Sequence, residues 1–195
     1  MKTRTTCFLL ILLITTLGFA QGAPQQPAAP AAAPPPPTVA AVLDRQLTGL
    51  EKQFVPLAEA MPEDKWDYRP TTGEYKDVMT FSQMVKHVAS ANFFNYARIL
   101  GEKPPADKNE SGPAALKTRA EILQYLKDSL AMGHRALATI TAENAVQPLP
   151  NPSGKGTPTR LALAIGPAGH AFDHYGQLVE YLRLNSIIPP ASRKQ

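Results

Sequence analysis

The sequence has almost no cysteine, and Cys7 is the only one among its 195 residues. Because Cys7 lies in an N-terminal segment that we expect to be removed, the mature chain would contain no thiol. This excludes a disulfide framework and a thiol enzyme. The fold must therefore be stabilised by its apolar core.

A long apolar run is also missing. The most apolar stretch, Cys7–Ala20, has fourteen residues, fewer than the roughly 20 that a membrane-spanning helix needs. Two basic residues precede it, and Gly18 and Ala20 stand at the −3 and −1 positions of a cleavage site. The pattern predicts a signal peptide over residues 1–20. We therefore expect an exported protein, periplasmic or extracellular, with no stable membrane insertion after cleavage; an uncleaved N-terminal anchor is the alternative.

Neither sign of charge dominates the sequence. The 20 basic and 16 acidic residues give a net charge of +4, and loss of the signal peptide would lower it to +2. The basic residues form no stripe with interleaved aromatic side chains, so we expect no nucleic-acid partner.

Proline is abundant, and much of it is concentrated in residues 21–37. This segment, QGAPQQPAAPAAAPPPP, contains seven prolines, six alanines and no charge. Such a composition cannot form a core, and it predicts a disordered, extended linker. A ligand for a proline-recognition domain is the alternative interpretation. Residues 38–190 remain as a single domain, and residues 191–195 form a short C-terminal tail.

Within the domain, the apolar pattern predicts four helices. Apolar residues recur every three or four positions over 38–60. Capping boxes begin the second helix, Thr80–Gly101, and the third helix, which starts at Thr118. Thr157-Pro158 is expected to supply the N-cap and first residue of the fourth helix, which stops before Pro189.

Two prolines fall inside these predicted helices. Each removes a backbone hydrogen bond, so we expect Pro56 to kink or shorten the first helix and Pro167 to bend the fourth. No alternating strand pattern competes with the helical one. The sequence therefore predicts an all-α four-helix bundle.

The chain has four histidines, and two of them form a spaced pair. His170 and His174 are four positions apart and project from the same helix face, where both could reach one ion at about 2.0–2.1 Å. A third ligand would come from His87, which has apolar neighbours, or from His134, which Arg135 places near the surface. The alternative is that the histidines are core residues and bind no metal.

Three motifs resemble those of the DinB/YfiT-like superfamily of metal-binding four-helix bundles. They are WDYRP, FSQMVKHVASANFF and HAFDHYGQLVEYLRLNSIIPP, and their order and separation extend the resemblance over residues 39–190. The resemblance implies a metal site formed by His87, His170 and His174, with no role for His134. Tyr175 stands where the family commonly has arginine.

Other polar side chains near these histidines are candidates for contacting a ligand imidazole or lining a pocket. They are Gln83, Asp173, Tyr175 and Gln177. Asp173 is either a partner for a ligand imidazole or a solvated residue. The WDYRP segment is expected to hold its loop against the bundle.

Three imidazoles leave a coordination position open, as in catalytic rather than structural metal sites. The ion is expected to be divalent, and zinc and nickel both suit imidazole. The sequence thus indicates a metal-dependent, hydrolase-type enzyme with an unknown small-molecule ligand. A non-catalytic bundle that binds metal or a small ligand is the alternative. The superfamily also contains thiol-dependent transferases, but an exported chain would not meet cytosolic thiols. A homodimer would fit the family.

Overall fold

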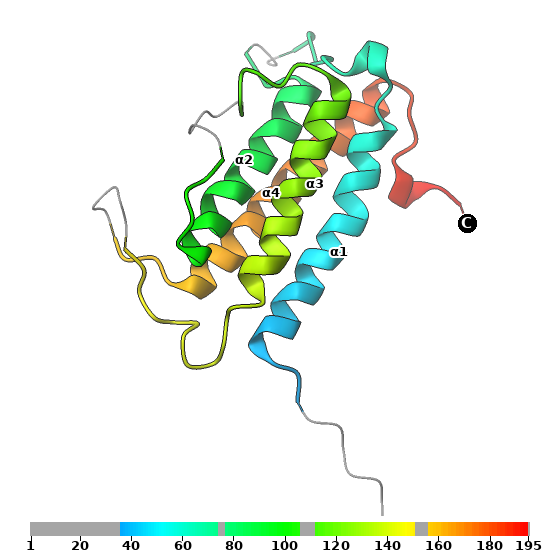
Figure 1. The fold of residues 1–195 in the computed structure, drawn as a ribbon. Helices are drawn as coiled ribbons and strands as arrows, with labels where there is room; N and C mark the ends of the chain where they lie inside the picture. The colour runs from blue at the N-terminus through cyan, green and yellow to red at the C-terminus, as the bar shows by residue number, and fades with distance from the viewer. Residues whose placement is uncertain (1–35, 74–76, 106–111, 151–155, 195) are drawn as a thin grey trace, which may run out of the picture. The chain divides into compact units, whose positions relative to one another are not determined.

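A computed structural model of the chain describes residues 36–73, 77–105, 112–150 and 156–194. These residues fold into four helices and two short 3₁₀ turns, which confirms the predicted all-α four-helix architecture (Figure 1). The predicted signal peptide and almost all of the predicted linker lie outside the described residues. The elements are α1 (Val39–Ala60), η1 (Glu63–Lys65), α2 (Phe81–Leu100), α3 (Arg119–Leu137), α4 (Arg160–Leu184) and η2 (Pro190–Ser192).

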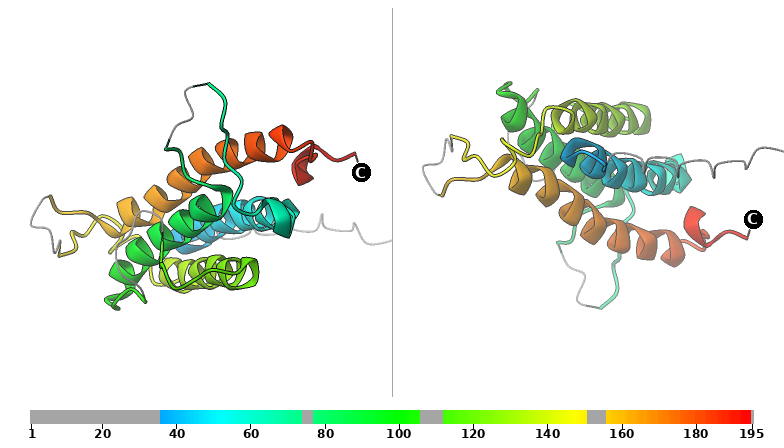
Figure 2. Two further views of the ribbon diagram at one scale, coloured as in Figure 1. Left: turned by 90° about the horizontal axis from the view of Figure 1, so that it is seen from above. Right: turned by 90° about the horizontal axis from the view of Figure 1, so that it is seen from below.

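The helices are not arranged in simple sequential order around the bundle. Helix α2 packs against α3 and α4, and α1 packs against the same two helices. Consequently α1 and α2 are diagonally opposite. Helices α2 and α3 run parallel to each other and antiparallel to α1 and α4 (Figures 1 and 2). This topology places the second and fourth helices side by side, which is what a metal site shared between them requires.

A threonine caps the N-terminus of each helix. In every case the side-chain oxygen accepts a hydrogen bond from the backbone amide three residues later, which satisfies one otherwise unpaired donor. Both predicted capping boxes form, at Thr80 and Thr118. Helix α2 ends where expected, at Gly101, whose φ of 70° lies in the left-handed region that glycine adopts without strain.

The predicted start of the fourth helix is wrong by two residues. Thr159, not Thr157, is the N-cap. The carbonyl of Pro158 accepts a hydrogen bond from the amide of Leu149 at 2.8 Å, and Thr159 forms an isolated antiparallel bridge with Pro148. These contacts hold the backbone extended until Thr159, so the helix begins later than the Thr-Pro pair suggests.

The internal prolines do not end their helices. Helix α1 continues through Pro56 to Ala60, and α4 continues through Pro167 to Leu184. Of the two expected effects of Pro56, a kink or a shorter helix, the shortening does not occur. Each proline removes one backbone hydrogen bond, but the residues that follow are held by packing: Leu57 is fully buried, and so is Leu178 in α4.

Apolar side chains from all four helices fill the centre of the bundle. Helix α3 and the residues just after it contribute a buried apolar stripe: Ile122, Leu126, Leu130, Leu137 and Ile140. At Gly133 the helices approach so closely that a Cβ atom would lie 2.7 Å from side-chain atoms of both Leu47 and Tyr96. Among the described residues, no helix combines the length and apolar character needed to cross a membrane.

The WDYRP segment fixes the loop between α1 and α2 against the bundle. Trp66 is 4% exposed, contacts Phe81 at a ring-centroid distance of 5.2 Å and lies under Arg119. Tyr68 meets Tyr181 of α4 edge to face, with 5.9 Å between ring centroids. Two backbone hydrogen bonds of 2.9 Å also join the loop to the first residues of α2. These contacts place the loop beside α4.

Candidate metal centre

Three histidines meet between α2 and α4. His87 comes from α2, while His170 and His174 occupy successive turns of α4. The Nε2 atom of His170 lies 2.8 Å from that of His87 and 3.1 Å from that of His174. All three rings are partly buried, and their ligand atoms lie within 4.8 Å of one another. The fold thus brings together the three residues that the family resemblance implied.

Hydrogen bonding alone cannot satisfy this arrangement. An imidazole nitrogen in the ring plane carries either a proton or a lone pair, not both. Because His170 Nε2 faces His87 Nε2 and His174 Nε2 at once, it cannot donate to one and accept from the other. At best it shares a single proton or lone pair between two neighbours. A cation between the rings would use all three lone pairs.

The distances are close to those that an ion would impose. Ligand nitrogens at about 2.0–2.1 Å from a tetrahedral ion lie about 3.3 Å from one another. The contacts of 2.8 and 3.1 Å are a few tenths of an ångström shorter. Small ring movements would therefore admit an ion, and the site fits a three-imidazole metal centre.

The electrostatics of the site favour the neutral form of the His170 and His174 imidazoles. Burial, followed by the neighbouring charges of His174 and His87, lowers the pKa of His170 from 6.5 to about 4. Burial and His87 also lower the pKa of His174, whereas Asp173 opposes both shifts. Neutral imidazoles are the form that coordinates a metal, so these two rings need lose no proton at neutral pH.

The Nδ1 atoms of the two α4 histidines have fewer hydrogen-bond partners than ligand histidines usually have. The Nδ1 atoms of His170 and His174 are buried and have no hydrogen-bond partner among the described residues. Ligand histidines commonly donate this N–H to a carboxylate or carbonyl. Asp173 does not fill that role here, because it is exposed and accepts a hydrogen bond from Gln177 at 3.0 Å. The orientation of the His170 ring therefore depends on helix packing.

The remaining candidate residues occupy different places. The side-chain carbonyl of Gln83 accepts a 2.9 Å hydrogen bond from the amide of Thr80, as part of the capping box. Tyr175 contacts Phe54 of α1, with 6.4 Å between ring centroids. Gln177 lines a pocket next to His174.

His134 lies away from the other three histidines, between α3 and α1. Its Nδ1 atom is 2.5 Å from a carboxylate oxygen of Asp44, and its Nε2 atom is 3.1 Å from one of Glu51. Although burial lowers the pKa of His134, the hydrogen bonds and charges of Asp44 and Glu51 raise it above 6.5 overall. Both ring nitrogens are engaged, so His134 holds two helices together rather than offering a ligand atom.

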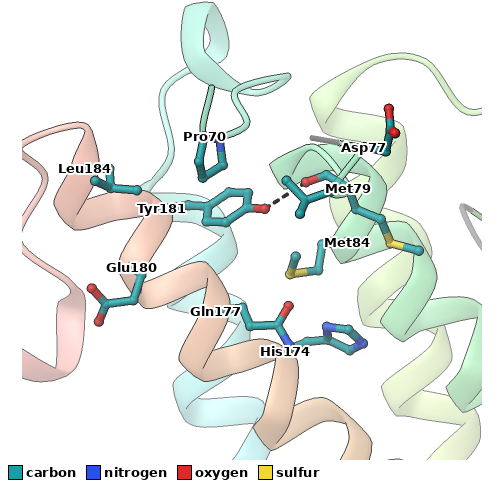
Figure 3. Close-up of a pocket in the computed structure, with 10 residues that line it drawn as sticks. Pro70, Asp77, Met79, Met84, His174, Gln177, Glu180, Tyr181 and Leu184 are labelled. Atoms are coloured by element: carbon teal, nitrogen blue, oxygen red, sulfur yellow. Dashed lines mark hydrogen bonds between the residues drawn. The ribbon is translucent and has the colours of Figure 1, made fainter. Parts of the chain in front are cut away.

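A pocket of about 500 Å³ adjoins the histidine cluster through His174 (Figure 3). We refer to it as the α4 pocket. Apolar side chains form most of its wall: Pro70, Val78, Met79, Met84, Tyr181 and Leu184. Asp77, Gln177 and Glu180 are the other lining residues.

Sequence reasoning missed most of this pocket. Gln177 is among the residues predicted to line a pocket, and helical phase also points to Tyr181 and Leu184, which follow His174 on the same face of α4. Residues 77–79 belong to the loop before α2, and no sequence pattern indicates that this loop lies beside α4. The hydroxyl of Tyr181 donates a 2.9 Å hydrogen bond to the carbonyl of Met79 and joins the two walls.

Comparison with known proteins agrees with the fold. The family model of the DinB superfamily matches residues 46–178, a range that includes all three clustered histidines. None of the curated proteins matches the chain.

Two solved structures are similar over nearly their whole length. The crystal structure of a conserved protein from Enterococcus faecalis matches with a TM-score of 0.62 and 15% identity, covering 76% of this chain and 98% of that one. A DinB-like protein from Bacillus subtilis matches with a TM-score of 0.57 and 17% identity, covering 79% of this chain and 99% of that one. At these identities the likeness shows the fold alone.

Proposed function

The chain belongs to the DinB superfamily, and on this premise we propose that it binds one divalent metal ion through the Nε2 atoms of His87, His170 and His174. The observation that carries the proposal is the double contact at His170 Nε2, at 2.8 and 3.1 Å. Protons can satisfy only part of this contact, whereas one ion would satisfy all of it. The ion is zinc or nickel, since imidazole suits both.

The proposed activity is that of a metal-dependent, hydrolase-type enzyme acting on a small molecule. A divalent ion at this site supplies a Lewis acid that polarises a substrate oxygen and lowers the pKa of a water ligand. Two features of the chain support this activity. Three protein ligands leave a coordination position open, and the α4 pocket adjoins His174. In that pocket, Gln177 provides an amide for orienting a bound molecule.

One observation favours the second candidate, a non-catalytic bundle that binds metal or a small ligand. Apart from His174, the described residues of the pocket wall offer only exposed carboxylates, those of Asp77 and Glu180, as groups that could move a proton at neutral pH. Such carboxylates are weak general bases at neutral pH. Turnover therefore decides between the two candidates.

The experiment is a turnover screen with esters, amides and phosphoesters on protein of known metal content. Hydrolysis that a chelator abolishes and added zinc or nickel restores would support the enzyme. Bound metal without turnover would favour the binding protein.

Export remains part of the proposal, on the evidence of residues 1–20 alone. Expression in a bacterial host should give a mature chain that begins at Gln21, which N-terminal mass analysis of the exported fraction would reveal. Cytoplasmic protein that retains Met1 would contradict export.

A further inference from the structure

The α4 pocket is placed to hold the part of a substrate that extends away from the metal. His174 is both a wall of the pocket and a member of the histidine cluster. Met84 precedes His87 by three residues on α2, and Gln177 follows His174 by three on α4. Figure 3 shows Pro70 and Leu184 at the end of the pocket away from His174. A molecule coordinated at the metal could therefore extend along this wall.

The wall is suited to an apolar group. Met79, Met84, Tyr181 and Leu184 all line the pocket, and in Figure 3 the thioether of Met84 points toward α4. The hydroxyl of Tyr181 is turned to the carbonyl of Met79, 2.9 Å away. The volume of about 500 Å³ is within the range of small-molecule sites. Burial of apolar surface is thus the main attraction that this wall can supply.

The charges at the wall have one sign. Asp77 and Glu180 contribute carboxylates, and the lining residues that the structure describes include no lysine or arginine. Two cations lie close to the wall: Arg183 forms an ion pair with Glu180 at 2.6 Å, and Arg69 donates a 3.5 Å hydrogen bond to the carbonyl of Val78. An anionic group in the pocket would lose hydration and face two carboxylates, while the guanidinium groups of Arg183 and Arg69 are already held by Glu180 and by the carbonyl of Val78. An uncharged or cationic group would not incur this electrostatic cost.

We propose that the substrate is an ester or amide whose acyl chain or leaving group is apolar, carries no negative charge and occupies the α4 pocket. This inference rests on the proposed function, because the metal fixes where the reacting group lies. A group that coordinates the ion directly can be anionic, because the ion balances its charge. The selection applies to the part of the molecule that extends from the ion.

Hydroxamic acids provide a test that does not need turnover, because they share one metal-binding head and differ only in the tail. Affinity for the zinc-loaded full chain would be measured by calorimetry for acetohydroxamic acid, octanohydroxamic acid, and eight-carbon analogues ending in a carboxylate or an amine. We expect the octano compound to bind about tenfold or more tightly than the aceto compound, since six further methylenes are buried. The carboxylate-tailed analogue should bind the weakest of the three long compounds.

Two sets of variants distinguish binding of the tail in the α4 pocket from binding to other exposed apolar surface. Leu184 and Ile188 are exposed apolar residues, 58% and 63% exposed, and only Leu184 lines the pocket. Leu184→Gln should reduce the advantage of the octano tail, whereas Ile188→Gln should preserve it. Combining Asp77→Asn with Glu180→Gln should raise the affinity for the carboxylate tail. Asparagine suits position 77, because its φ of 65° lies in the left-handed region that asparagine tolerates.

The outcomes distinguish the pocket from the metal site. If the loaded protein binds acetohydroxamic acid but gains nothing from the octano tail, or binds the carboxylate tail as well as the octano tail, the pocket proposal is overturned alone. If the protein retains no zinc, or the loaded protein does not bind acetohydroxamic acid, the proposed function fails and the inference fails with it.

Discussion

Replacing His134 with glutamine should weaken the contact between α1 and α3 at acidic pH and change it little at alkaline pH. The ring bridges Asp44 and Glu51, at 2.5 and 3.1 Å, and these carboxylates hold the pKa of His134 above 6.5 despite the opposing effect of burial. A raised pKa means that the stabilisation is fully present below about pH 6.5 and is lost as the pH rises through the folded-state pKa.

The expected magnitude is modest, because the two carboxylates are 47% and 38% exposed. Partly exposed ion pairs contribute about 0.2–1 kcal/mol each, so both together should contribute about 1 kcal/mol. For a domain of this size that corresponds to about 2–4 °C in melting temperature.

The assay is the difference in melting temperature between wild type and His134→Gln, measured with chelator between pH 5.5 and 9. Asp44→Asn in both backgrounds gives a double-mutant cycle for one of the two pairs. The difference should be largest near pH 5.5 and close to zero at pH 9. A difference that is constant with pH, or that grows as the pH rises, would refute the assignment of His134 as a protonated clamp.

Three further predictions concern the metal site and the packing. Changing His87, His170 or His174 to Ala should remove metal-dependent stabilisation, about 2.7 kcal/mol when free metal is a hundred times its dissociation constant, while His134→Gln should keep it. Melting curves with and without metal measure this stabilisation, and an equal value in all four variants would contradict the assignment. In the His134→Gln background with chelator, urea midpoints should fall as the pH drops below 6.5 toward the pKa of about 4 of His170. In this range the unfolded chain binds protons that the buried rings, with their lowered pKa, do not bind. Midpoints that rise would argue against a neutral buried cluster. Gly133→Ala should destabilise the fold by about 1–3 kcal/mol because its Cβ would lie 2.7 Å from Leu47 and Tyr96. Gly49→Ala, whose Cβ meets no atom within 4 Å, should stabilise the fold by up to about 1 kcal/mol. Urea denaturation of both variants checks the contrast.

The parts of the fold that depend on neighbouring residues could be predicted from the sequence. The capping boxes at Thr80 and Thr118 are short-range hydrogen-bond patterns, and both are present. The pairing of His170 with His174 follows from helical phase alone. The start of α4 could not be predicted in this way, because a contact between Leu149 and Pro158 keeps the backbone extended.

The third member of the histidine cluster depends on which helices are neighbours. Spacing alone left His87 and His134 open, and only the family resemblance favoured His87. In the structure α2 packs against α4, which brings His87 to the pair, while α3 packs against α1, which brings His134 to Asp44. The wall of the α4 pocket depends on a long-range contact of the same kind, between Tyr181 and Met79. Periodicity carries no information about such contacts.

The most direct test of the metal centre is elemental analysis of the untagged full-length protein, purified without chelator, beside its His170→Ala variant. His170 is the informative position because its Nε2 atom contacts both other imidazoles. We predict about one zinc or nickel ion per chain in the wild type and a large loss in the variant. Wild-type protein that holds no stoichiometric metal, and takes up none when titrated with zinc or nickel at neutral pH, would contradict the account.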